Sequence, residues 1–309
     1  MLDACSESPR QILFVALSNI GDLVMTTPAL IALHQQFPQA LIDVVADKRS
    51  GELLAACPFV GEIIWKEKQT SALQKWRFLK KIRRRKYFLA IDLRGPWLAW
   101  LSRSEHRGTK RARRDDMHAV EHHFTAISTF IQNPDIPWTN LWVSQSAADK
   151  AEKIYADAGV KTKRLLALAP GANWPGKIWP AEHYAELTNL LGTDFDAVCL
   201  LGAQEDESRC HDIASVSNLP CIDLSGKLSL AESAACLARA RFFVGNDSGL
   251  GHLAAALNVP SLTVFGPGEP HRYRPWGARA EIILAPQEDL SRLLPAAVAT
   301  RVSSLMASA

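Results

Sequence analysis

Asp22 stands between a segment rich in strand formers, ILFVAL (12–17), and an apolar helical pattern, VMTTPALIALHQQF (24–37). A carboxylate at such a junction can take a proton from a substrate hydroxyl and so act as a general base. It can also cap the helix, because an acidic side chain near a helix N-terminus satisfies free N–H groups and opposes the helix dipole. The fragment alone favours capping.

Lys177 ends a segment, GANWPGK (171–177), that has the spacing of a phosphate-binding P-loop. Ile178 replaces the hydroxyl residue that would hold magnesium, and Pro180 interrupts the helix that should follow, so we reject a P-loop. A lysine on a loop before a helix can still contact a phosphate. A solvated surface lysine is the alternative.

The segment NDSGLGH (246–252) follows a predicted buried strand and begins a predicted helix. Its small residues would let a ligand approach closely, and the helix N-terminus offers N–H groups to an anion. Asp247 would repel a phosphate and suits sugar hydroxyls better, whereas capping by Asp247 or Ser248 explains the pattern equally well. Glu205, Asp206 and Glu207 follow another predicted strand, and one of these acids could accept from ribose hydroxyls, or all could simply lie in the first turn of a helix.

Two other segments invite functional interpretations. HAVEH (118–122) fits the H-x-x-E-H zinc-peptidase pattern, but a helix with surface histidines explains it better because no supporting third ligand follows. Lysines and arginines are concentrated in KWRFLKKIRRRK (75–86) and HRGTKRARR (106–114). The first segment suggests a solvated helix face or, because of its aromatic residues, a contact with an anionic membrane. The second suggests a loop.

The elements that would position these residues alternate between strand and helix patterns. Short, continuously apolar strands between helices predict parallel sheets covered on both faces. This alternation is interrupted at DIPWTNLWVS (135–144) and resumes after it. The sequence therefore predicts two Rossmann-like domains, at 1–145 and 146–309. Ligands bind beyond the carboxyl ends of such strands. Asp22, Lys177 and Asp247 all follow predicted strands, so Asp22 becomes a candidate for the site as well as for a cap.

Composition sets broad limits. The 309 residues suit two domains, and the net charge of +3 does not suggest a nucleic-acid binder. The six cysteines form no CxxC pair and lie largely in apolar patterns, which suggests core residues in a reducing compartment. Neither a signal peptide nor a bilayer-spanning apolar run is evident, so the predicted location is the cytoplasm.

Three motifs in order carry a family resemblance: GDLVMTTPAL (21–30), GANWPGKIWPAEHYAEL (171–187) and FVGNDSGLGHLAAALNVPSLTVFGP (243–267). Together with RRKYFLAIDLRG (84–95), they resemble the lipopolysaccharide heptosyltransferases of glycosyltransferase family 9, over most of the chain from about Ile12 to Trp276. The resemblance implies an α/β fold of GT-B type, in which two Rossmann-like domains with parallel sheets face a central cleft. The first domain would bind the acceptor and the second the nucleotide-sugar, with the last helix packing back on the first domain.

The resemblance also implies inverting transfer of heptose from ADP-heptose to the inner core of lipopolysaccharide, without a metal or any other cofactor. Asp22 would be the general base, and Lys177 would assist catalysis at the phosphates. The partners would be the donor, the lipopolysaccharide acceptor and the cytoplasmic face of the inner membrane. The residues predicted to bind the donor are Asn173, Lys177, Asp206, Asp247, Ser248, Gly249 and His252, and those predicted to bind the acceptor are Asn19, Gly21, Arg111, Arg113 and Arg114. Asn173 departs from the hydroxyl residue that some members carry near the phosphates.

Other functions remain open at this point. A nucleotide-sugar epimerase of the same fold would need further acid and base residues around the donor sugar. A P-loop kinase would require magnesium. A non-catalytic nucleotide-sugar-binding protein of core assembly would not depend on Asp22.

Overall fold

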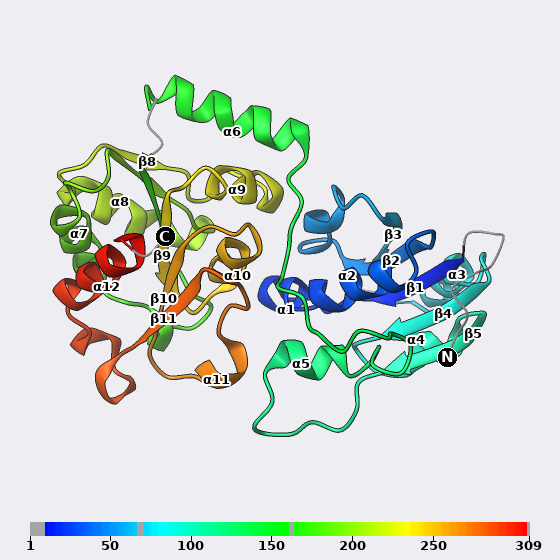
Figure 1. The fold of residues 1–309 in the computed structure, drawn as a ribbon. Helices are drawn as coiled ribbons and strands as arrows, with labels where there is room; N and C mark the ends of the chain where they lie inside the picture. Colours follow the sequence, from blue (N-terminus) through cyan, green and yellow to red (C-terminus); the bar gives the residue numbers. More distant parts are fainter. Residues whose placement is uncertain (1–9, 67–70, 161–163, 308–309) are drawn as a thin grey trace. The chain divides into compact units, whose positions relative to one another are not determined.

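A computed structural model of the protein describes residues 10–66, 71–160 and 164–307 (Figure 1). The chain divides into two compact units, Met1–Trp142 and Val143–Ala309. Each unit contains one parallel sheet with helices packed against it. The two units are described separately below.

The first unit holds a five-stranded parallel sheet in the order β3-β2-β1-β4-β5. Its strands are β1 (Gln11–Val15), β2 (Leu41–Asp47), β3 (Val60–Lys66), β4 (Tyr87–Asp92) and β5 (Ser104–Thr109). Its helices are α1 (Ile20–Val24), α2 (Thr27–Gln36), α3 (Ala72–Ile82), α4 (Trp97–Leu101) and α5 (Ala119–Phe124), with the short 3-10 helix η1 (Gly51–Leu54). The central strand β1 is apolar and buried over 12–15, as expected for a parallel strand covered on both faces.

The predicted helix at 23–37 is instead two helices, α1 and α2. The hydroxyls of Thr26 and Thr27 donate to the carbonyls of Leu23 and Val24, at 2.7 and 2.8 Å. Such back-bonding competes with the helical ladder, and Pro28 lacks the N–H that would continue it. Asp22 therefore belongs to a separate short helix directly after β1.

A buried carboxylate anchors the basic segment to the sheet. Asp43 on β2 is fully buried, and Arg85 Nη1 donates to both its oxygens, at 2.7 and 2.5 Å, while the Tyr87 hydroxyl donates at 3.1 Å. This contact raises the pKa of the Arg85 guanidinium, and burial together with Asp43 raises the pKa of Tyr87. Arg85 is thus a structural residue, unlike its exposed neighbours Arg83 and Arg84.

The second unit holds a six-stranded parallel sheet in the order β11-β10-β9-β6-β7-β8. Its strands are β6 (Leu165–Ala169), β7 (Ala197–Leu200), β8 (Cys221–Asp223), β9 (Phe242–Asn246), β10 (Ser261–Phe265) and β11 (Ala280–Leu284). Its helices are α6 (Gln145–Asp157), α7 (Ala181–Leu190), α8 (Glu207–Val216), α9 (Leu230–Leu237), α10 (Gly249–Ala256), α11 (Pro270–Tyr273) and α12 (Pro295–Ala307), with short 3-10 turns that include η2 (Pro175–Lys177) and η3 (Gln204–Asp206).

The last helix, α12, belongs to the second unit, where it packs against α7. Val298 and Val302 are fully buried in the same core as Trp179 and Leu187. The apolar stripe of the helix is thus used within the second unit, while the prediction that this helix packs back on the first domain stays a prediction.

The cysteines are core residues where the structure describes them. Cys57, Cys199, Cys210 and Cys236 are buried and reduced, and Cys221 is partly buried, while Cys5 lies outside the described residues. Burial raises the pKa of the Cys199 and Cys210 thiols to about 12, which keeps them protonated and unreactive. Within the described ranges no helix is both long and apolar enough to cross a membrane.

Candidate functional site

Lys177 and Asp247 come together at the carboxyl end of the second sheet. Lys177 lies in η2, on the loop after β6, and Asp247 directly follows the neighbouring strand β9. Their side chains form an ion pair, with Lys177 about one-third exposed and Asp247 only 10% exposed. A methyl group on Gly268, after β10, would lie 3.6 Å from Asp247 and 3.8 Å from Lys177. Three adjacent strands therefore bring a cation, a carboxylate and a bare backbone to one place.

The loop that carries Lys177 is not a P-loop. It forms a single 3-10 turn, and helix α7 begins only at Ala181, after Pro180. In a P-loop the lysine itself stands in the first turn of the helix. Lys177 is instead fixed by its partner Asp247, which differs from the freely solvated lysine that the sequence left as the alternative.

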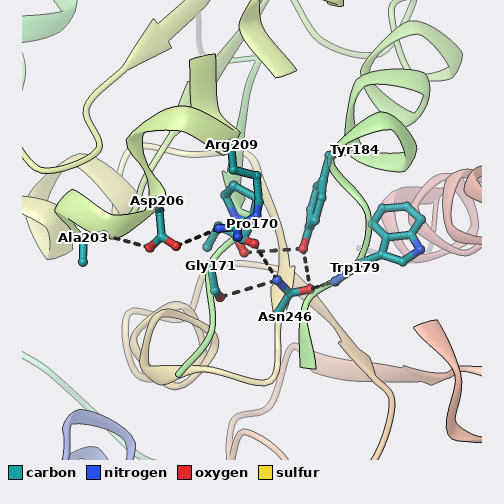
Figure 2. A network of polar contacts seen from close by, with 9 residues as sticks. Pro170, Gly171, Trp179, Tyr184, Ala203, Asp206, Arg209 and Asn246 are labelled. Carbon is teal, nitrogen blue, oxygen red and sulfur yellow. Dashed lines mark hydrogen bonds and ion pairs between the residues drawn. The ribbon is translucent and has the colours of Figure 1, made fainter. Parts of the chain in front are cut away.

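Asn246 holds this loop to the end of β9 (Figure 2). Its buried Oδ1 accepts from the Trp179 backbone N–H and from the Tyr184 hydroxyl, both at 3.0 Å. Its Nδ2 donates to the Pro170 carbonyl at 2.8 Å and, more weakly, to that of Gly171 at 3.5 Å. The side-chain amide of Asn246 thus binds both ends of the loop. The sequence did not predict this role, because the partners of Asn246 lie far away in the chain.

We expect Asn246→Leu to lower the free energy of unfolding by at least about 2 kcal/mol, because each buried N–H, hydroxyl or carbonyl left without a partner costs about 1–3 kcal/mol. Affinity for ADP should fall as well, since the Lys177 loop loses its anchor. Urea denaturation and calorimetry measure the two effects. Asn218→Leu, at an exposed asparagine of the same unit, is the matched control. A stable Asn246→Leu protein would show that the loop does not depend on this network.

Asp206 lies against the start of the same loop. Its carboxylate accepts from the Ala203 backbone N–H at 3.0 Å and from Arg209 at 2.9 Å (Figure 2). A methyl group on Gly171 would come within 2.2 Å of it, so glycine is required there by close packing. The structure places Asp206 in the turn that begins α8, while its predicted contact with a ribose remains a prediction.

Three of the remaining predicted donor-binding residues, Ser248, Gly249 and His252, lie at the start of α10. Ser248 is the N-cap residue of α10, yet its hydroxyl is buried and has no hydrogen-bond partner among the described residues. Gly249 begins the helix, and His252 is buried one turn further on. Asn173, on the Lys177 loop, is exposed. A buried hydroxyl without a partner at a helix N-terminus suits a polar ligand atom.

In the first unit, Asp22 lies in the first turn of α1 and is partly buried. Its carboxylate accepts from the Asn19 side chain at 2.9 Å. Asn19 is the N-cap residue, and within the described residues neither its side chain nor that of Asp22 caps a backbone N–H of the helix. Gly21 lies between them. The contact with Asn19 orients one carboxylate oxygen, which a capping role would not require.

Asp92, at the end of β4, builds a turn next to this region. The buried carboxylate accepts from the N–H groups of Arg94 and Gly95 with one oxygen, at 3.0 and 3.1 Å. Its other oxygen accepts from Leu98 at 2.9 Å and Ala99 at 3.4 Å, in the first turn of α4. The same turn directs Arg94, whose Nε donates to the Ala16 carbonyl at 2.7 Å, toward the end of β1. Asp92 and Arg94 belong to the segment RRKYFLAIDLRG (84–95) of the family resemblance, and these contacts give both residues a structural role.

A cationic pocket of about 440 Å³ opens at the ends of β4 and β5. Its lining includes Arg94, Lys110, Arg111 and Arg113 together with His122. Arg113 and Arg114 also approach the adjacent carboxylates Asp115 and Asp116, at 3.8 and 2.9 Å. Of the three arginines predicted to bind the acceptor, Arg111 and Arg113 line this pocket and Arg114 does not. Arg94 and Lys110 also line it, although the sequence did not predict them.

The histidines of HAVEH are buried instead of lying on the surface as predicted. His118 Nδ1 accepts from the Val120 N–H at the start of α5, and His122 Nε2 donates to the Arg111 carbonyl at 3.1 Å. Among the described residues, no group of three or more histidine, cysteine or acidic side chains is arranged to hold a metal ion. His118 is a cap and His122 a support of the cationic loop.

Comparison with known proteins identifies the family of the chain. The family model of glycosyltransferase family 9 (heptosyltransferase) matches residues 75–294. The chain belongs to this family. Lipooligosaccharide heptosyltransferase 2 of Haemophilus ducreyi is 30% identical over 307 residues, which cover 88% of each chain. Lipopolysaccharide heptosyltransferase 2 of Escherichia coli K12 is 30% identical over 305 residues, covering 88% of this chain and 87% of its own. The protein is thus a glycosyltransferase, as predicted.

Comparison of structures confirms the fold class. The E. coli ADP-heptose lps heptosyltransferase II has a TM-score of 0.82 and 24% identity, and the match covers 96% of this chain and 99% of that one. The two parallel sheets with their helices are therefore those of the GT-B heptosyltransferases.

Proposed function

We propose that this family 9 enzyme transfers a heptose from ADP-heptose to the inner core of lipopolysaccharide, with inversion at the anomeric carbon. Family membership carries the proposal. The relatives at 30% identity are a lipooligosaccharide heptosyltransferase and a lipopolysaccharide heptosyltransferase. The ion pair of Lys177 with Asp247 and the cationic pocket of the first unit supply groups of the right charge for the two substrates.

The donor is assigned to the carboxyl end of the second sheet. Lys177 would contact the diphosphate and stabilise the charge that ADP carries away when the bond from the anomeric carbon to the phosphate oxygen breaks. Asp247 would hold the lysine and accept from a sugar hydroxyl. The Ser248 hydroxyl and the α10 N-terminus would donate to the ligand, and Asp206 would accept from the ribose.

The acceptor is assigned to the first unit. Its hydroxyl oxygen would form the new bond to the anomeric carbon, and its proton would pass to Asp22. The cations of the pocket, with Asn19 and Gly21 near Asp22, would position an acceptor that carries carboxylates or phosphates. The proposal includes catalysis without a metal and peripheral contact of the enzyme with the cytoplasmic face of the inner membrane.

Product analysis tests the proposal directly. The purified protein is incubated with ADP-heptose and a panel of truncated lipopolysaccharide cores, with and without a chelator. We expect the mass of one heptose to be added to a core acceptor, equally well in both conditions. Conversion of the nucleotide-sugar without transfer would indicate an epimerase, and a strict magnesium requirement would contradict the metal-independent mechanism.

A further inference from the structure

Two short helices of the first unit, α3 and α4, expose large aromatic side chains. Trp97 and Trp100 on α4 are 75% and 65% exposed, and Trp76 on α3 is 57% exposed. Leu73 and Leu101 on the same helices are also exposed. The helices bury other residues in the core, namely Ile82 and Ala99 with Phe78 and Leu98 packed beside them. The exposed residues are therefore not part of this core.

We call the exposed apolar residues of these two helices the tryptophan face: Trp76, Trp97 and Trp100 with Leu73 and Leu101. Residues of α3 and α4, including Trp76, Leu79, Trp97 and Leu101, line a shared hollow of about 400 Å³ together with Lys66 and Lys75. A soluble monomer rarely exposes a contiguous apolar surface of this kind unless something binds to it.

The charge around the tryptophan face is positive. Lys75, Arg77, Lys80, Arg83 and Arg84 are all exposed, and within the described part of the chain none of them forms an ion pair. Lys80 Nζ lies 5.1 Å from the Trp76 ring, and the Arg107 guanidinium lies 5.2 Å from the Trp100 ring. Tryptophan mixed with lysine and arginine is the composition of surfaces that sit at the headgroup level of anionic bilayers.

The tryptophan face and the cationic pocket share a support. Asp92 holds the turn that carries Arg94, which lines the pocket, and also caps the helix that carries Trp97 and Trp100. The two features are thus fixed to each other within a few residues of chain. An acceptor sugar attached to a lipid would reach the pocket at the membrane surface if the tryptophans were anchored there.

We propose that the tryptophan face docks on an anionic lipid bilayer, with Trp76, Trp97 and Trp100 in the headgroup region and the α3 cations on the lipid phosphates. This inference deepens the membrane contact of the proposed function by naming the surface that makes it, and it rests on the proposed transfer reaction for the lipid-linked acceptor. The partner itself is identified by the combination of exposed indoles and unopposed positive charge. A protein partner would more often be recognised by a surface of mixed charge.

The test uses the full-length protein and vesicles of phosphatidylcholine, with or without phosphatidylglycerol. We expect sedimentation with the anionic vesicles alone, weakened by salt. Trp97→Ala/Trp100→Ala should weaken this binding roughly tenfold, and Lys75→Glu/Lys80→Glu should reduce it to the level seen without phosphatidylglycerol. Trp138→Ala, at a tryptophan 54% exposed elsewhere in the unit, is the matched control and should bind as the wild type does.

Enzyme assays separate this inference from the proposed function. The tryptophan variant should keep wild-type transfer to a short soluble acceptor and lose transfer to an acceptor embedded in vesicles. A wild type that ignores anionic vesicles, or a tryptophan variant that binds them normally, would overturn the inference. A protein that binds vesicles but transfers no heptose to either acceptor would overturn the proposed function and leave the docking surface standing.

Discussion

Asp22→Asn should reduce turnover by roughly 10²- to 10⁴-fold, the usual contribution of a general base. Asparagine has the same shape and can still accept from the Asn19 side chain, which donates to Asp22 at 2.9 Å. It cannot take a proton. In the proposed mechanism the proton would be transferred late, when the attacking oxygen has become acidic through partial bonding to the anomeric carbon. Initial rates with saturating donor measure the effect.

The controls distinguish loss of a base from loss of structure. Affinity for ADP and the unfolding midpoint should be unchanged in Asp22→Asn, since the residue belongs to the first unit and its contact with Asn19 is kept. Asp157→Asn, at the exposed end of α6, removes a carboxylate of no predicted function and should be fully active. Normal turnover of Asp22→Asn, or a loss that follows only from unfolding, would reduce Asp22 to a structural residue.

Lys177→Ala should weaken ADP binding roughly 10- to 100-fold, because a hydrogen bond to a charged group contributes about 1.5–3 kcal/mol. The variant also leaves Asp247, which is only 10% exposed, without its cation and facing the diphosphate. Adenosine, which lacks phosphates, should bind the variant and the wild type equally well. Calorimetry with both ligands gives the comparison.

A double-mutant cycle with Asp247→Ala separates the two parts of this effect. If Lys177 contacts the phosphates, the double variant should remain weaker than the wild type while regaining part of what Lys177→Ala loses. Lys153→Ala, at an exposed lysine of α6, should behave as the wild type. Equal losses for ADP and adenosine would show that Lys177 merely shapes the loop.

The sequence predicted the elements best where burial is complete on both faces. The strand predicted from LIDVVAD (41–47) has these limits in the structure, because its residues other than Asp43 and Asp47 are apolar. The edge strand β5 was missed, since Ser104–Thr109 shows mostly polar residues and its basic flank suggested a loop. The helix α4 was missed as well, because its start is fixed by Asp92 and not by a residue at its own N-terminus.

Site residues were predictable when a motif marked them and unpredictable when distant partners define them. Lys177 and Asp247 could be selected from their strand ends, but their ion pair joins residues 70 positions apart. Asn246 and Arg94 act through contacts with backbone carbonyls that no local pattern shows. Arg85 looked like one more surface cation because Asp43, its buried partner, lies 42 residues earlier.

The turn at Asp92 is held by contacts to the main chain, so its backbone does not depend on the side chains that it presents. In the part of the chain that the structure describes, its carboxylate accepts hydrogen bonds from main-chain N–H groups alone, at Arg94, Gly95, Leu98 and Ala99. Side chains on the turn and on the outer face of the following helix can therefore be exchanged without altering the backbone that presents them. If the pocket binds the acceptor and the helix meets a lipid surface as proposed, substitutions at those positions would change the preferred acceptor or lipid while Asp92 stays in place.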